Sequence, residues 1–347
     1  MLRLVRRMEI RMIRVWFNHW FSTSYRLIEL MKEDADKKIC IIGSNMRKNS
    51  VIQMVCDEWY EEPTFEGEEY INYCLDFCKD RQIDVFVPRR NMLSISQNIN
   101  KFNNIGVKVL LDDHETISLL EDKVKTYDFF KGIEGINVPE YYRVSTVSGF
   151  KEAYNKLSSC YVTVCAKFVK DEGGQSFRKI IKENRGLKKI KSYAGAGISY
   201  EEYLAILKAE ESFDDIILMP YLEGYEISVD CLNTEKGLIA IPREKGSSRD
   251  ERVFYDEDIL NSVKIVSSKI DIKYPFNVQF KYKGDTPYLL EINTRMSGGL
   301  QMSCLAADVN IPNIALNKLL GVEVDWVQKK KEAVVSYVEI PYVIKWE

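Results

Sequence analysis

The chain has 347 residues, of which 46% are hydrophobic and 29% are charged, and its formal net charge is −3. This composition is typical of a globular protein with a sizeable core, divided into two or three packed units. The nearly balanced charge argues against a nucleic acid or an anionic membrane as the main partner, because neither sign dominates the surface.

Eight cysteines and two histidines restrict the chemistry that the chain can carry. Cys74 and Cys78 have helical spacing, but no second pair and no nearby histidine completes a zinc site. His19 and His114 leave little material for a catalytic triad. Residues 1–11 are basic, lack the apolar core of a signal peptide and are interpreted as an extension to the fold. We expect a cytoplasmic protein with reduced thiols.

Short apolar runs alternate with amphipathic stretches over residues 12–112. The runs are Ile13–Phe17, Ile39–Gly43, Val85–Pro88 and Val107–Leu111. This alternation predicts a doubly wound parallel sheet with helices between the strands. No GxGxxG motif follows the first strand, which argues against a dehydrogenase. Gly43 in a strand-end turn is weak evidence for a ligand.

Residues 113–160 are expected to be helical. Asp112 and Glu115 precede a helical stripe that ends at Gly132, and a second helix is expected near Gly149–Leu157. The stripe consists of Ile117, Leu120, Val124 and Tyr127.

Residues 161–221 combine strand-like runs with the glycine-containing segment Asp171–Phe177, and they predict a small lid subdomain.

Residues 222–347 predict an antiparallel sheet. One helix is expected near Asp258–Lys269, a helical region should run from Gly299 toward Leu320, and a terminal strand is expected over Ala333–Trp346. A hairpin is indicated by the turn residues Lys283, Gly284 and Asp285 between two alternating runs. The fold class is therefore mixed, with both α/β and α+β parts.

The face pattern of this hairpin predicts a cation site. If Val278, Phe280, Leu290 and Ile292 share the core, the strand register is set, because a slip of one residue would bury the polar side chains instead. Gln279 then lies opposite Glu291, with Asn293 on the same face. These oxygen-bearing side chains suit Mg²⁺. The alternative is an ordinary solvated hairpin face.

Three further segments allow both a structural and a functional interpretation. The strand that carries Glu226, Ser228 and Asp230 is amphipathic, but its acids could also meet a ribose or a metal. Gly173 and Gly174 suit a simple turn or a phosphate loop. The apolar strand around Lys167 favours snorkelling of the lysine to the surface, with an anion contact as the alternative.

A basic run occupies Pro242–Phe254. Arg243 and Lys245 belong to it, and so do Arg249 and Arg252, interleaved with acids. Such a run is usually a solvated loop. It could equally form a lid that contacts an acidic substrate.

Four segments and their order along the chain resemble the ATP-grasp superfamily, and most of all its carbamoyl phosphate synthetase and biotin carboxylase branch; they are taken here from the last segment to the first. Glu291–Arg295 resembles the signature Glu-x-Asn-x-Arg, and Asn277–Phe280 resembles a strand with a glutamine metal ligand. Tyr221–Asp230 resembles the hinge of the family together with the strand that follows it, and Leu120–Lys123 resembles the entry to the ATP-grasp region. The resemblance covers residues 13–325.

The resemblance implies a role for each candidate residue. It implies that ATP and Mg²⁺, as two ions and with Mn²⁺ as a substitute, are the cofactors. Metal would be bound by Glu291 and Asn293, with Gln279 assisting. Arg295 would stabilise an acyl phosphate, and Arg243 and Lys245 are candidates for recognising an acidic substrate. The ATP contacts would be Lys123, Lys167, Gly173, Gly174, Gln175, Ser176, Phe177, Met219, Pro220, Tyr221, Leu222 and either Glu223 or Glu226.

The implied activity is an ATP-dependent ligase that joins a small-molecule carboxylate to an amine through an acyl phosphate. Arg243-Glu244-Lys245 stands where the synthetase would have a histidine, which makes bicarbonate a poor candidate acceptor. The alternative is an ATP-binding subunit that no longer ligates. A homodimer is a family-level expectation, and neither nucleic acid nor membrane is an expected partner.

Overall fold

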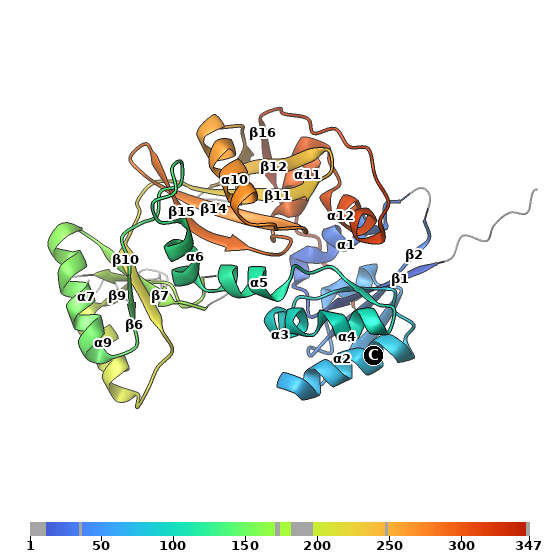
Figure 1. Cartoon of the computed structure of the whole chain (residues 1–347), viewed down its shortest axis with the longest axis horizontal. Coiled ribbons are helices and arrows are strands. Elements are labelled where there is room, and N and C mark those ends of the chain that lie inside the picture. The colour runs from blue at the N-terminus through green and yellow to red at the C-terminus, as the bar shows by residue number, and fades with distance from the viewer. Residues whose placement is uncertain (1–11, 35–36, 171–173, 182–196, 247–248, 345–347) are drawn as a thin grey trace, which may run out of the picture. The chain divides into compact units, whose positions relative to one another are not determined.

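The computed structural model describes residues 12–34, 37–170, 174–181, 197–246 and 249–344 (Figure 1). The chain divides into two compact units. The first unit comprises the chain up to Ser118, Ser228–Asn277 and the chain from Asn293, and the second comprises Leu119–Ile227 and Val278–Ile292. The predicted extension over residues 1–11 lies outside the described residues.

The first unit contains the predicted parallel sheet, with strand order β3-β2-β1-β4-β5. The strands are β1 Ile13–Asn18, β2 Ile39–Asn45, β3 Glu58–Glu61, β4 Val85–Val87 and β5 Lys108–Val109. The helices between them are α1 Tyr25–Lys32, α2 Gly67–Asp80, α3 Met92–Gln97 and α4 Ile99–Asn104, with 3-10 turns at Ser22–Ser24 and Val51–Val55. The doubly wound arrangement is confirmed.

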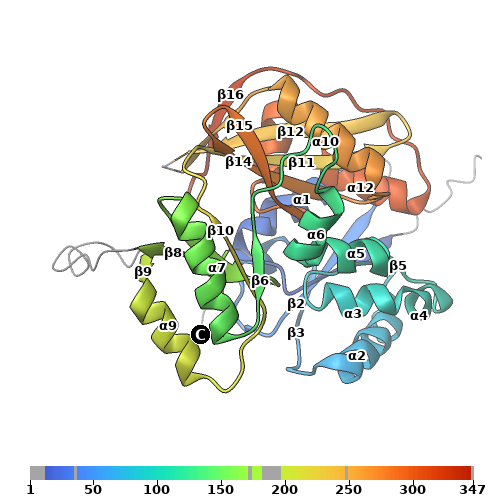
Figure 2. The same ribbon diagram turned by 60° about the vertical axis from the view of Figure 1, so that its left-hand side comes forward.

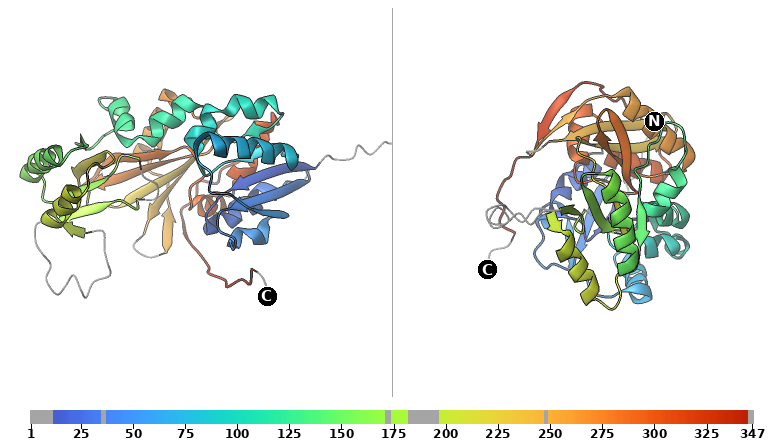
Figure 3. Two further views of the ribbon diagram at one scale, coloured as in Figure 1. Left: turned by 90° about the horizontal axis from the view of Figure 1, so that it is seen from below. Right: turned by 90° about the vertical axis from the view of Figure 1, so that its left-hand side faces the viewer.

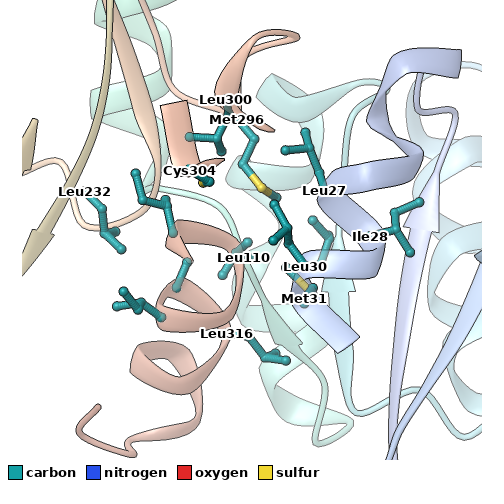
Figure 4. Packing of buried hydrophobic residues seen from close by; sticks show 14 of the residues in the cluster. Leu27, Ile28, Leu30, Met31, Leu110, Leu232, Met296, Leu300, Cys304 and Leu316 are labelled. Atoms are coloured by element: carbon teal, nitrogen blue, oxygen red, sulfur yellow. The ribbon is translucent and has the colours of Figure 1, made fainter. Parts of the chain in front are cut away.

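Alternation along β1 supplies both faces of this sheet with buried side chains. The helix α2 lies beside this sheet (Figure 3, left). Trp16 packs against α2, and its ring centroid lies 4.5 Å from that of Phe77. Val15 and Phe17 point to the other face, where they join α1 in a cluster that extends to the last helices of the chain (Figure 4). The strands are therefore almost continuously apolar, as expected of a sheet covered on both faces.

The second unit contains a sheet with strand order β6-β10-β7-β8-β9. The strands are β6 Tyr142–Val144, β7 Val164–Phe168, β8 Arg178–Ile181, β9 Gly197–Ser199 and β10 Ile216–Pro220. The helices α7 (Val147–Cys160) and α9 (Tyr200–Ala209) lie side by side beside it (Figure 2). Stacked rings join these helices, since the centroids of Tyr154 and Tyr200 are 4.4 Å apart.

The predicted stripe before Gly132 forms two helices rather than one. They are α5 His114–Glu121 and α6 Lys123–Phe130. Asp122 separates them because its carboxylate accepts hydrogen bonds from the backbone of Val124 and Lys125, both at 3.0 Å. Aspartate at an N-cap satisfies free N–H groups and so starts a new helix.

The third sheet has the order β15-β14-β11-β12-β13-β16. The strands are β11 Glu226–Thr234, β12 Gly237–Lys245, β13 Asp250–Val253, β14 Phe276–Lys283, β15 Thr286–Asn293 and β16 Ala333–Ser336. Its associated helices are α10 Glu257–Lys269, α11 Leu300–Ala307 and α12 Ile311–Leu320.

Two expectations for this region were wrong. The described residues of the basic run are mostly strand rather than a solvated loop, because β12 and β13 pair antiparallel, with Arg243 opposite Val253. The terminal strand is confined to Ala333–Ser336, where it pairs with β13, and the described residues beyond it are not in a strand. None of the helices in the described ranges is long and apolar enough to span a membrane.

The β14–β15 hairpin forms with Gly284 at its turn, at a φ of +57°. Val278, Phe280 and Ile292 are buried as predicted, with at most 2% of their surface exposed. Leu290 was expected in the same core, but it is only partly buried, and its neighbour Leu289 is fully buried. The predicted opposition of Gln279 and Glu291 stays a prediction.

Candidate active site

Lys123 and Glu291 meet in the second unit. Lys123 is the first residue of α6, and its Nζ lies 3.9 Å from Oε2 of Glu291 on β15. The same Nζ donates to the carbonyl of Val169 at 3.4 Å, and only 5% of the lysine is exposed. From the same helix, the hydroxyl of Tyr127 donates to the carbonyl of Leu290 at 2.7 Å. One helix therefore holds both the lysine and the strand that carries the carboxylate.

Lys167 on β7 adds a second buried lysine to this region. It is 9% exposed, so the expectation that it snorkels to the surface was wrong. Burial lowers the pKa of Lys167, the carboxylates of Glu291 and Glu226 act in the opposite direction, and Lys123 lowers it further. A lysine is retained in such a place when its charge has a partner or a ligand to meet.

The two buried lysines favour an anionic ligand. The ammonium group of Lys123 lies 3.9 Å from Glu291, the carboxylate of Glu291 acts electrostatically on Lys167, and burial disfavours the charged form of Lys167. A polyanion such as the phosphates of a nucleotide would relieve that penalty. Lysine is a compact point charge that suits phosphate oxygens without demanding a fixed geometry.

Residues 174–177, the described part of the glycine-containing segment after β7, form a turn closed by hydrogen bonds. Gly174 has a φ of +65°, and its carbonyl accepts from the N–H of Phe177 at 3.1 Å. The hydroxyl of Ser176 accepts from the N–H of Phe168 at 2.9 Å, which ties the turn to the strand that carries Lys167. Gln175 belongs to the same turn, whereas Gly173 lies outside the described residues.

The predicted adenine-binding segment follows directly from β10. Met219 and Pro220 close that strand, Leu222 is 2% exposed, and the N–H of Tyr221 donates to the carbonyl of Thr163 at 2.9 Å. These contacts fix the main chain of the segment.

Charged and aromatic groups surround the Tyr221 ring. The Nζ of Lys179 lies 3.7 Å from the ring centroid, and the ring of Phe177 lies 6.3 Å away. The glycine segment and the hinge therefore approach one another. An aromatic ring with a cation over it can form one wall of a site for a nucleotide base, because a base stacks well on such a ring.

The hinge passes very close to β14. The N–H of Gly224 donates to the carbonyl of Tyr282 at 2.9 Å. A Cβ at this position would stand 2.6 Å from that carbonyl oxygen, so glycine is required here for steric reasons. Glu223 is exposed and Glu226 is half-buried, and the electrostatic influence of Glu226 on Lys167 favours it over Glu223 as the functional acid.

A buried polar network in the first unit was not recognised from the sequence. Arg243 is 2% exposed, and its guanidinium donates to Asp230 at 3.1 Å and forms an ion pair with Glu251. It also donates to the hydroxyls of Ser303, at 3.0 Å, and Ser297, at 3.4 Å. The sequence feature that could have revealed this network was the polar face of β11, on which Asp230 lies.

The network holds the segment that follows Arg295. Ser297 donates to Asp230 at 2.5 Å, and Asn277 donates to the same carboxylate at 2.8 Å. A Cβ on Gly299 would stand 2.3 Å from the Arg243 guanidinium, so the glycine makes room for the arginine. Contact of Arg243 or of the half-buried Lys245 with a substrate stays a prediction, and the observed contacts of Arg243 are structural.

Asn293 and Arg295 also belong to the first unit. Asn293 is the last residue of β15, and the Arg295 guanidinium donates to the carbonyl of Met296 at 3.4 Å. Arg295 helps to line a small cavity together with Trp20 and Val87 from the ends of β1 and β4. Gly43, in contrast, is explained by packing, because a Cβ there would stand 2.4 Å from the Cys56 Sγ.

The donor set suits Mg²⁺ better than a transition metal. Among the described residues, no group of three or more His, Cys, Asp or Glu side chains is arranged to hold a metal ion. Glu291, Gln279 and Asn293 offer oxygen donors only, and Mg²⁺ commonly completes such a shell with nucleotide phosphates. Glu291 next to the lysines fits a metal that arrives together with its phosphates.

Comparison with known proteins identifies a family model and several proteins that are similar to this chain. Residues 212–341 match a family described as ATP-grasp in the biosynthetic pathway with Ter operon. The carbamoyl phosphate synthase large chain of Thermoplasma volcanium is 25% identical over 87% of this chain. That of Thermoanaerobacter sp. is 25% identical over 83% of this chain. The chain spans only 29% and 26% of the lengths of these relatives.

In sequence and in fold, the chain is similar to proteins of the ATP-grasp superfamily. Solved structures agree in fold. The ADP complex of purK, an N5-carboxyaminoimidazole ribonucleotide synthetase, has a TM-score of 0.69 at 13% identity and matches 94% of this chain and 81% of its own. Biotin carboxylase from Campylobacter jejuni has a TM-score of 0.67 at 17% identity and matches 93% of this chain and 75% of its own. The predicted ATP-grasp architecture is therefore confirmed.

Proposed function

We propose that this ATP-grasp protein is a ligase that phosphorylates a small-molecule carboxylate with ATP and joins the acyl phosphate to an amine, releasing ADP and phosphate. The observation that carries the proposal is the pair of buried lysines near one carboxylate. Lys123 and Lys167 are at most 9% exposed, and both interact with Glu291. Two buried ammonium groups in a nucleotide-binding fold suit the transfer of a phosphoryl group.

The residues of the second unit supply the nucleotide contacts in this proposal. Lys123 and Lys167 bind the phosphate oxygens, and the turn Gly174–Phe177, which is tied to the strand of Lys167, covers the phosphates. The hinge Met219–Leu222 frames the adenine, with the Tyr221 ring as a wall. Glu226 accepts from a ribose hydroxyl, as its position near Lys167 allows.

The signature residues, together with Gln279, stabilise the negative charge of the transferred phosphoryl group. Glu291, Asn293 and Gln279 bind Mg²⁺, which neutralises the charge that develops on the phosphate oxygens. Arg295 holds the acyl phosphate through its planar guanidinium. Asp230 and Arg243 keep the segment after Arg295 in place through Ser297 and Ser303. Positioning and electrostatics, rather than covalent catalysis by the protein, carry the reaction.

A screen for substrate-triggered ADP release tests the proposal. The full chain is mixed with Mg-ATP and pairs drawn from amino acids, dipeptides and other small acids, and the products are identified by mass spectrometry. We expect at least one pair to raise ADP production and to yield a conjugate whose mass equals that of the two substrates minus water. ATP binding without ADP release for any pair would contradict the proposal and support a non-ligating subunit.

The carbamoyl phosphate synthase relatives suggest which acid to test first and which to test last. They are much longer than this chain, so the present chain corresponds to only part of such a protein. Arg243-Glu244-Lys245 occupies the β12 position where the resemblance predicts a histidine. We therefore place organic acids before bicarbonate in the screen.

A further inference from the structure

The edge strand β16 continues into a segment that has the sequence of a strand but is not part of a sheet. Beyond Ser336 the chain runs through residues 337–344, which form neither a helix nor a strand (Figure 3, left). We call these eight residues the arm. Residues 333–340 read Ala-Val-Val-Ser-Tyr-Val-Glu-Ile, and valine, isoleucine and tyrosine are residues that strands favour. Only the first half of this run pairs with β13.

Side chains keep the alternation of a strand from β16 into the start of the arm. Val335 and Tyr337 are partly buried, and the hydroxyl of Tyr337 donates to the carbonyl of Gly298 at 3.0 Å. Val334 and Val338 are exposed instead, with 72% and 80% of their surfaces open to solvent. Successive side chains of an extended chain point to opposite faces, so this pattern continues the two faces of β16 beyond its last paired residue. The start of the arm therefore prolongs the edge of the sheet.

This edge lacks the features that usually keep a free edge from pairing with another chain. β16 is the last strand in the order β15-β14-β11-β12-β13-β16, so one side of its main chain has no neighbouring strand among the described residues. Charged side chains or a proline within an edge strand normally prevent such pairing. Neither occurs from Ala333 to Val338, and the first proline is Pro341. Exposed β-branched side chains along an open edge, here Val334, Val338 and Ile340, indicate an interaction surface.

The side chains along this edge are complementary to a second copy of the same edge. If two copies pair antiparallel with Ser336 on the two-fold axis, Val334 lies opposite the partner's Val338. In the same register Val335 lies opposite the partner's Tyr337, so exposed side chains meet exposed ones and partly buried side chains meet partly buried ones. Pairs of β-branched and aromatic residues directly across two antiparallel strands stabilise a sheet. A contact of this kind is isologous, because each copy contributes the same surface.

The charges that flank the apolar run favour the same register. The exposed Lys331 precedes the run and Glu339 follows it, so antiparallel pairing about Ser336 brings Glu339 diagonally across from the partner's Lys331. The Oε1 of Glu339 pairs with Arg249 of its own chain, and a carboxylate can accept a second cation through its other oxygen. A shift of one residue would bring Glu339 opposite the partner's Glu332 instead, and like charges directly opposite are destabilising.

We propose that β16 and the arm form the interface of a homodimer, in which the β16 strands of two copies of this chain pair antiparallel about Ser336. The pairing lengthens each β16 toward Ile340 and ends at Pro341, which has no N–H to donate. The two antiparallel sheets then form one continuous sheet. Because both copies use their only copy of this edge, the assembly closes at two chains. The interface lies within the first unit and does not depend on the proposed ligase activity.

Sedimentation equilibrium of the full chain over a wide concentration range tests the dimer, and we expect monomer and dimer but no larger species. The variant V338K places a lysine on the open edge, as natural edge strands do, and should raise the dissociation constant of the dimer by about 10- to 100-fold, because the two-fold axis doubles each change. Val338 is 80% exposed in the single chain, so V338K should keep the parental unfolding curve. The matched control V327K changes a valine of the same unit that is 79% exposed and lies outside this edge, and it should dimerise like the parent.

A cysteine at the proposed axis tests the register. Residues directly opposite in antiparallel strands have Cα atoms about 4.5–5.5 Å apart, which is within the range of a disulfide. The variant S336C is made together with C160S, because Cys160 is the exposed cysteine among the described residues. Mild oxidation should convert S336C into a covalent dimer. The control V327C, made in the same C160S background, should give no covalent dimer.

Three results would overturn this inference. A full chain that stays monomeric at every concentration would show that the edge does not pair with a second copy and would leave the arm to a different partner. A dimer that V338K does not weaken, or in which S336C does not cross-link, would place the interface elsewhere. An assembly that keeps growing with concentration would contradict a contact that closes at two chains. None of these measurements requires turnover, so the ligase proposal and the dimer stand or fall separately.

Discussion

The Nζ of Lys123 lies 3.9 Å from Oε2 of Glu291, and both groups depend on α6 for their positions. Lys123 begins this helix, and Tyr127, one turn later, donates to the carbonyl that precedes Glu291. The proposed metal ligand therefore has a cationic partner in Lys123. In the proposed complex with Mg-ATP, this ion pair gives way to contacts of Glu291 with the metal and of Lys123 with a phosphate.

The variant E291Q tests this exchange of partners. Glutamine keeps the size of the side chain but removes the charge that the metal needs, so we expect Mg²⁺ to lose most of its effect on ATP affinity. Turnover should fall by about 100-fold or more, a typical result of removing a ligand that acts on the transferred phosphoryl group. Titration calorimetry with ATP, in the presence and absence of Mg²⁺, measures the first effect without any knowledge of the substrate.

The matched control for E291Q is E152Q. Glu152 forms a 2.8 Å ion pair with Lys156 on the exposed surface of α7, so this change also removes a carboxylate that faces a lysine. E152Q should bind Mg-ATP like the parent. Parental Mg²⁺ dependence in E291Q would show that Glu291 is not a metal ligand.

Lys167 should make nucleotide binding and protein stability oppose one another. Its charge is buried, so the variant K167M should lose ATP affinity and yet raise the free energy of unfolding at neutral pH, by on the order of 1 kcal/mol. Burial lowers the pKa of Lys167 below the ordinary 10.5, so its destabilising effect is complete below the folded-state pKa and disappears as pH rises toward 10.5. The advantage of K167M should therefore shrink at alkaline pH.

Denaturant unfolding of the parent and K167M at several pH values, with ATP binding measured in parallel, checks both effects. K208M is a suitable comparison, because Lys208 is an exposed lysine of α9 in the same unit and has no place in the proposed nucleotide site. A K167M protein that is less stable than the parent at neutral pH would show that the ammonium stabilises the unliganded fold.

Arg243 should be a stability residue whose effect depends on Asp230. R243M leaves the buried carboxylates of Asp230 and Glu251 without their cation, and we expect a loss of about 3–5 kcal/mol. The variant D230N/R243M removes charge on both sides of the 3.1 Å pair and should lose less than the sum of its two single variants. Urea unfolding of the four proteins gives this coupling, and additive losses would contradict a shared network.

The sequence predicts the fold well where the signal is local. Alternation from Ile13 to Phe17 and from Ile39 to Gly43 belongs to β1 and β2, and helical spacing from Tyr70 to Cys78 belongs to α2. Each pattern reports the face that its own segment buries, and that face is determined within a few residues. The glycine turn of the β14–β15 hairpin is equally local.

The failures concern side chains whose partners are distant in the sequence. Lys167 was expected to snorkel because its own strand is apolar, but its environment includes Glu291. Arg243 was assigned to a solvated basic run because its neighbours are charged, but its partner Asp230 lies on another strand. The stripe before Gly132 broke at Asp122, whose capping of α6 outweighed the continuous apolar pattern. Burial of a charge is a property of the fold and has no periodicity in the sequence.

Asp112 should give the stability of the first unit a distinct pH dependence. Burial raises the pKa of Asp112 to about 7, although its Oδ1 accepts from the N–H of Lys273 at 2.6 Å. Its Oδ2 is buried and has no hydrogen-bond partner among the described residues, so the neutral acid is the better occupant of this place. The folded state therefore binds the proton more tightly than the unfolded state does.

The sign of the effect follows from that difference. The contribution of Asp112 is fully present below its ordinary pKa of 3.8 and is lost as pH rises through about 7. The loss corresponds to about 4 kcal/mol, at about 1.4 kcal/mol per pH unit. D112N stays uncharged at every pH, so it should be more stable than the parent at pH 8 and should lack this decline between pH 4 and 7. The control D76N changes an exposed aspartate of α2 and should follow the parent. Unfolding curves measured across this range decide the matter, because identical profiles for D112N and the parent would mean that Asp112 is ionised in the fold at neutral pH.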